Sequence, residues 1–107
     1  MPKYLALFKY SEEGAKGLMK EKAAAREAAG RKAYESVGGR LEAIYWVPTG
    51  EYSGVEIVEL PNAAAALTAL AYSTGAFSEY RSIELLTTSE LDGALGKPMA
   101  YRPPGGN

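Results

Sequence analysis

The chain contains neither cysteine nor histidine among its 107 residues. Without cysteine there is no disulfide and no thiolate nucleophile, and without either residue the usual zinc ligands and imidazole acid–base chemistry are missing. No glycine-rich phosphate loop is recognisable, because Gly38-Gly39 follows a predicted helix and precedes a strand, the reverse of the required order. We therefore expect no metal site and no cofactor.

A strong charge of one sign is also missing, since 12 basic and 13 acidic residues leave a net charge of −1. This balance gives no general attraction to nucleic acid or to an anionic membrane. The longest uncharged stretch, residues 61–78, is rich in Ala, Ser and Thr and indicates a buried element rather than a membrane span. The apolar opening at residues 4–8 is too short for a signal peptide. We expect a cytoplasmic protein with no nucleic-acid or membrane partner.

The length suits one domain, predicted at residues 1–100, followed by an extended tail at residues 101–107. The hydrophobic pattern predicts strands at residues 4–10, 40–47, 55–60 and 80–86. It predicts one long helix from the Ser11 cap to Ser36, a second at residues 63–74, and a short third that begins at a Thr87–Glu90 capping box. Gly30 within the long helix indicates either close packing or a bend. The order predicts an α+β, ferredoxin-like βαββαβ antiparallel sheet with two covering helices and a C-terminal helix.

Both faces of this predicted sheet are apolar. Strict alternation places Tyr4, Ala6, Phe8 and Tyr10 opposite Leu5 and Leu7 in the first strand, and Leu41, Ala43, Tyr45 and Val47 opposite Ile44 and Trp46 in the second. Two helices cover only one face, so the other needs a partner. We expect this partner to be a second copy of the chain in a homodimer or higher homo-oligomer. The space between the two sheets then either holds a ligand or is filled with aromatic side chains.

Three segments resemble a known family: residues 1–10, the turn and strand from Gly50 to Val58, and residues 80–86. Together they are similar to the GYD-domain family, whose motif is a Gly, a Tyr and an Asp at this turn. Gly50 and Tyr52 match the motif, whereas Ser53 stands where the family has Asp. The resemblance extends to about residue 100 and implies a ferredoxin-like domain that forms a dimeric α/β barrel.

Three residues are candidates for binding a ligand: Trp46, Tyr52 and Arg81. Arg81 lies on a predicted strand and could fix a ligand carboxylate or phosphate, or instead pair with a nearby glutamate. The motif residues also have a purely structural explanation. Gly50 would supply a positive φ in a tight turn, and Ser53 would bond to its own backbone there.

Four strand glutamates could meet inside a barrel, either as a cation site or as an acid–base pair, or could lie at solvated positions: Glu42, Glu56, Glu59 and Glu84. The register between the second and third strands decides this. If Trp46 pairs with Glu56, Glu42 shares a face with Glu56. If Trp46 pairs with Val55, Glu42 shares a face with Glu59.

Three functions remain open at this stage. The first is a homodimer that binds a small organic molecule between packed sheets. The second is a cofactor-free monooxygenase or isomerase of the dimeric α/β-barrel type, which would have to use Tyr, Glu or the reactivity of its substrate. The third is a structural or assembly protein whose aromatic sheet face is only an interface.

Overall fold

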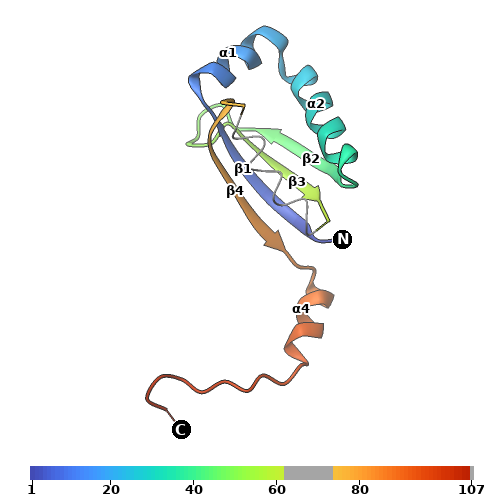
Figure 1. Ribbon diagram of the computed structural model, residues 1–107, viewed down its shortest axis with the longest axis vertical. Helices are drawn as coiled ribbons and strands as arrows, with labels where there is room; N and C mark the ends of the chain where they lie inside the picture. The colour runs from blue at the N-terminus through green and yellow to red at the C-terminus, as the bar shows by residue number, and fades with distance from the viewer. Residues whose placement is uncertain (62–73, 107) are drawn as a thin grey trace.

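The computed structural model describes residues 1–61 and 74–106 and has the predicted α+β, ferredoxin-like architecture (Figure 1). Its strands are β1 (Lys3–Tyr10), β2 (Arg40–Trp46), β3 (Gly54–Glu59) and β4 (Phe77–Leu85). Its described helices are α1 (Glu12–Glu21), α2 (Ala23–Ser36) and α4 (Thr88–Leu95). The helix predicted at residues 63–74 falls almost entirely outside the described residues.

The four strands form one antiparallel sheet in the order β2-β3-β1-β4. In Figure 1, α2 runs along one face of this sheet, which we call the inner face, and α1 lies at the end of the sheet where β1 finishes. We call the opposite side of the sheet the open face. Alternate residues of the central strands are buried on the inner face, among them Ala6 and Phe8 of β1 and Glu56 and Val58 of β3. Leu41, Val58 and Leu60 form the hydrophobic core cluster, against which Tyr34 of α2 packs. Burial of these side chains holds α2 to the sheet.

Strand β2 departs from strict alternation, because its pairing with β3 shifts between Leu41 and Ala43. Leu41 pairs with Val58 and Ile44 pairs with Glu56, so Leu41 lies on the inner face with Ile44. The prediction that Leu41 shares a face with Ala43 is therefore wrong, because a β-bulge inserts one extra residue and reverses the alternation beyond it. Trp46 pairs with Gly54, which is neither of the two registers considered from the sequence.

The single long helix predicted before β2 is two helices. Ser11 caps α1 as expected, with its hydroxyl accepting the Gly14 N–H at 3.1 Å. The break lies at Lys22, whose backbone has φ 76° and ψ 165°. This conformation is not helical and allows the chain to change direction between α1 and α2. The prediction of one helix was wrong because the residues around Lys22 are good helix formers and give no local stop signal.

The C-terminal residues extend beyond the end of β4, away from the sheet (Figure 1). The predicted capping box is present, since the Thr87 hydroxyl accepts from Glu90 N–H and the Glu90 carboxylate accepts from Thr87 N–H. The chain measures 60 × 31 × 25 Å, with a radius of gyration of 17.3 Å, against about 13 Å for a compact domain of this length. Within the described residues, no helix is long and apolar enough to cross a membrane.

Candidate functional site

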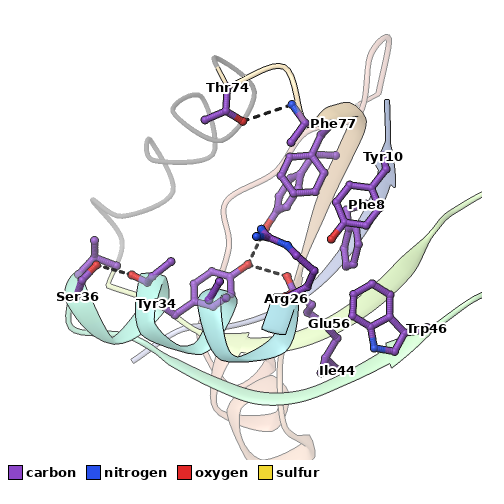
Figure 2. Close-up of a pocket in the computed structure, with 16 residues that line it drawn as sticks. Phe8, Tyr10, Arg26, Tyr34, Ser36, Ile44, Trp46, Glu56, Thr74 and Phe77 are labelled. Carbon is purple, nitrogen blue, oxygen red and sulfur yellow. Dashed lines mark hydrogen bonds between the residues drawn. The ribbon is translucent and has the colours of Figure 1, made fainter. Parts of the chain in front are cut away.

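A cavity of about 400 Å³ lies between α2 and the inner face of the sheet (Figure 2). Its helical wall comes from α2, where the small residues Ala29, Gly30 and Ala33 lie between the larger side chains of Arg26 and Tyr34. The opposite wall is the sheet, and Ala76 and Phe77 also line the cavity. The three small residues of α2 therefore leave space between the helix and the sheet.

Aromatic rings form the sheet wall. Tyr10 is nearly parallel to Phe77, with ring centroids 5.3 Å apart and an interplanar angle of 12°, and nearly parallel to Trp46, at 6.5 Å and 20°. Phe8 lies edge-on to all three rings at centroid distances of 5.4 to 5.9 Å. Such pairs add stability beyond the area they bury. The row of Trp46, Tyr10 and Phe77 thus forms a rigid apolar surface.

Gly54 makes room for this arrangement. It pairs with Phe8 across the β1–β3 ladder, and a Cβ atom built on Gly54 would collide with the Phe8 ring. The glycine therefore allows the ring to lie directly over the neighbouring strand. Phe8 is buried as a result and supports the rings that line the cavity.

One carboxyl group faces this apolar space. Glu56 is only 7% exposed, and its Oε1 accepts a hydrogen bond from the Tyr34 hydroxyl at 2.7 Å. The Tyr80 hydroxyl lies 3.4 Å from that of Tyr34. Burial raises the pKa of Glu56, and the bond from Tyr34 offsets part of that rise. Burial, together with the Glu56 carboxylate, also holds the pKa of Tyr34 far above its usual range, so Tyr34 remains a hydroxyl donor.

The second oxygen of Glu56, Oε2, lies toward α2. A Cβ atom on Gly30 would be 3.7 Å from it, so Gly30 marks close packing of the helix over this carboxyl and not a bend. No residue that the structure describes forms a hydrogen bond to Oε2 or an ion pair with Glu56. Because no buried side-chain oxygen of the described residues lacks a hydrogen-bond partner, Oε2 is accessible from the cavity and offers an unused acceptor site there.

Arg26 of α2 is the other charged residue of the cavity lining. It forms an ion pair with Glu21 at 3.2 Å. Burial acts to lower the pKa of the Arg26 guanidinium, but Tyr10 and Glu21 raise it above its ordinary value. Arg26 is therefore a cation whose charge is already balanced by Glu21.

Two of the three binding candidates from the sequence, Trp46 and Tyr52, line a second cavity of about 530 Å³ beside the turn, whereas Arg81 lines neither cavity. Trp46 lines the cavity on the inner face. Arg81 lies on the open face, is largely exposed and pairs with Glu79 at 3.5 Å, so the ion-pair alternative for Arg81 is the one found. Tyr52 lies in the turn before β3, near Arg81 and Glu79, outside the lining of the cavity on the inner face.

The turn residues have roles that differ from those expected. The glycines with positive φ among the described residues are Gly38, Gly75 and Gly105, so the prediction of a positive φ at Gly50 is wrong. A Cβ atom on Gly50 would instead lie 2.5 Å from a methyl group of Val47, so close approach favours glycine there.

Ser53 does not bond to its own backbone as predicted. Its hydroxyl oxygen accepts the Tyr10 N–H at 3.0 Å, and its own N–H donates to the Phe8 carbonyl at 2.8 Å. Because Tyr10 runs past the start of β3, its N–H finds no partner in the β1–β3 ladder. Ser53 therefore extends the pairing of β1 and holds Tyr10 at the cavity wall.

The four strand glutamates separate. Glu56 faces the cavity, whereas Glu42 and Glu59 lie on the open face, where Arg40 approaches their carboxylates at 3.6 and 2.9 Å. Glu84 is exposed on the edge strand β4. In residues 1–61 and 74–106, no group of three or more acidic residues is placed to hold a metal ion.

Sequence reasoning missed three residues of this cavity: Arg26, Tyr34 and Phe77. Tyr34 lies four residues after Gly30 on the predicted helix, a spacing that puts both residues over Glu56. Phe77 was left outside β4, which begins three residues earlier than predicted. The position of this aromatic residue just before the predicted strand at residues 80–86 was the feature of the sequence that could have indicated the longer strand.

Comparison with known families gives one match: the model of the family described as GYD domain matches residues 4–95. Neither the curated proteins nor the solved structures include a match to this chain.

Proposed function

This chain belongs to the GYD-domain family, and from its cavity we propose that it binds a small, largely apolar organic molecule between α2 and the inner face of the sheet. The observation that carries the proposal is the cavity itself. Its volume of about 400 Å³ lies within the usual range for small-molecule sites, roughly 300–1,000 Å³. Its walls combine aromatic rings with a few convergent polar groups, which is the composition typical of such sites.

The location differs from the one expected from the sequence, which was the space between two packed sheets. The described cavity lies within one protomer, on the side opposite the open face. Ligand binding and self-association would therefore use different faces of the same sheet. This separation favours a binding module over a purely structural protein, because an interface alone gives no reason for a cavity on the helical side.

Filling the cavity tests the proposal. Ala29 lines it and is exposed on α2, so Ala29→Phe should place a ring in the space without disturbing the core. Ala28, its exposed neighbour, does not line the cavity, so Ala28→Phe is the matched control. The probe is 2-phenylethanol, and the readout is the single indole N–H resonance of Trp46, the one tryptophan of the chain.

We expect 2-phenylethanol to shift the Trp46 resonance in the wild type and in Ala28→Phe, and to bind Ala29→Phe at least about tenfold more weakly. Native mass spectrometry of the purified protein should also reveal any small molecule carried from the expression host. Equal binding by the two variants, or no binding by the wild type, would refute a site in this cavity.

We further propose that the partner of the open face is a second copy of the chain. The open face contains a band of apolar residues that the described helices do not cover: Leu5, Leu7, Ala43, Tyr45, Val55, Ile57, Ile83 and Leu85. Around the band lie residues of both charges: Lys3, Lys9, Arg40, Glu42, Glu59, Glu79 and Arg81. A face with both signs of charge can meet a copy of itself without net repulsion.

A further inference from the structure

Glu56 gives the cavity a chemical preference. It is 7% exposed, and its partner among the described residues is a neutral hydroxyl, that of Tyr34. Buried carboxylates are normally paired with a cation, because removing the charge from water is costly. Arg26, the basic residue of the described cavity lining, could serve as the counter-ion, but it already forms an ion pair with Glu21. The protein therefore presents a buried carboxyl group for which its described residues supply no counter-ion.

The surroundings of Glu56 suit a cation that carries an apolar body. The rings of Tyr10, Trp46 and Phe77 form one wall (Figure 2). Aromatic faces attract ammonium groups through their quadrupole, most strongly where water is excluded. The same rings provide a flat surface for the apolar part of a ligand.

The free acceptor site on Glu56 Oε2 further limits the chemical class of the ligand. Glu56 Oε2 accepts no hydrogen bond from the described residues, so a ligand that donates one would satisfy it. A primary or secondary ammonium group combines the positive charge with N–H donors, whereas a quaternary ammonium has no donor. The Glu56 carboxylate would repel an anionic ligand. Arg26 would not offset that repulsion, because it already pairs with Glu21.

We propose that the cavity is selective for an organic amine: a primary or secondary ammonium group bound to Glu56 Oε2, joined to an aromatic body that lies against Tyr10, Trp46 and Phe77. This inference rests on the proposed function, because it specifies the class of ligand for the same cavity.

The test compares two probes that differ in one group. Phenethylamine and 2-phenylethanol share the same body, and only the first carries a cation. Both are titrated by calorimetry and by the Trp46 indole resonance at about pH 8, where the amine is still protonated. We expect the wild type to bind phenethylamine about tenfold or more tightly than 2-phenylethanol.

Two variants locate the effect. Glu56→Gln keeps the shape of the side chain and an oxygen that accepts from Tyr34, but removes the charge. It should lose the preference for the amine, so that the variant binds phenethylamine and 2-phenylethanol with similar affinity. Glu35→Gln removes an exposed charge of α2 outside the cavity lining and should keep the full preference.

Each outcome decides the proposal. Equal affinity of the wild type for both probes would overturn the amine preference but leave the proposed function standing, and this comparison needs no variant to fold. Failure of both probes would refute the proposed function and this inference with it. A preference that persists in Glu56→Gln would also overturn the inference, because the cation would then be held elsewhere.

Discussion

Ser53 shows how a motif position can tolerate a different residue. The resemblance to the GYD family implies an Asp at this position, and this chain has Ser. The Ser53 hydroxyl oxygen accepts the N–H of Tyr10, a residue of the cavity wall. Both Ser and Asp carry a side-chain oxygen that can accept a backbone N–H, so the requirement at this position is an acceptor rather than a charge.

Ser53→Ala should therefore lower the free energy of unfolding by about 1 kcal/mol, because the partly buried Tyr10 N–H loses its acceptor. Ser53→Asp should lie closer to the wild type. Urea denaturation measures both. Ser82→Ala is the control and should be neutral, because Ser82 is exposed on β4 and its side chain forms no hydrogen bond to a described residue. Equal stability of Ser53→Ala and Ser82→Ala would show that the bond to Tyr10 contributes nothing.

Glu56 could not be placed from the sequence. It was one of four strand glutamates whose faces depended on a register that composition and alternation leave open. The actual register pairs Trp46 with Gly54 and includes a bulge between Leu41 and Ala43. Across the β1–β3 pairing, the Phe8 ring lies against Gly54, and these residues are 46 positions apart. Such contacts between strands are tertiary, and no local pattern reports them.

The break between α1 and α2 concentrates strain in one residue. Lys22, with φ 76° and ψ 165°, occupies a region that is essentially restricted to glycine. The two helices nevertheless need this change of direction, because α1 starts beside β4 while α2 must cross the sheet above the cavity. The Lys22 side chain forms no cap, and the side-chain contact across the break is the ion pair of Arg26 with Glu21, which is partly exposed.

Lys22→Gly should raise the free energy of unfolding by about 1 kcal/mol, since relief of backbone strain exceeds the added entropy of the unfolded chain. The matched control is Lys32→Gly, an exposed lysine within α2, which should lower the free energy of unfolding by about 1 kcal/mol. Thermal and urea unfolding of both variants give the sign. If Lys22→Gly were destabilised as much as Lys32→Gly, the chain would not carry strain at Lys22.

The elements with strong local signals were predictable from the sequence. Short apolar runs marked all four strands, and Ser11 and the Thr87–Glu90 pair marked two helix starts. Each feature that was missed depends on a single residue. The bulge after Leu41 reverses the alternation of β2, and the backbone of Lys22 interrupts the predicted helix. Trp46, a candidate because it is a large aromatic on an apolar strand, lines the cavity. Tyr34 was missed because a helical tyrosine at a face margin looks peripheral until α2 is placed over Glu56.

Two apolar surfaces of this chain remain without a described partner. One is the open face of the sheet. The other is the C-terminal region from residue 86, where exposed apolar side chains follow β4: Leu86, Leu91, Leu95, Met99 and Tyr101. This region extends away from the sheet and accounts for the elongated shape (Figure 1). An apolar sheet face and a projecting apolar segment in one small chain both favour self-association, because a second copy can cover them together.

Disrupting the open face should therefore convert a dimer into monomers. Ile83 lies on this face, is 49% exposed and can be replaced without opening the core. In Ile83→Arg, a charge would be buried between two sheets, which should weaken association by about a hundredfold or more. Met19→Arg, at a 74% exposed apolar residue of α1, is the control and should leave the dimer intact.

Sedimentation equilibrium of both variants and the wild type measures the effect, and circular dichroism verifies the fold. A wild type that sediments as a monomer, or an Ile83→Arg variant that remains dimeric, would exclude the open face as the interface.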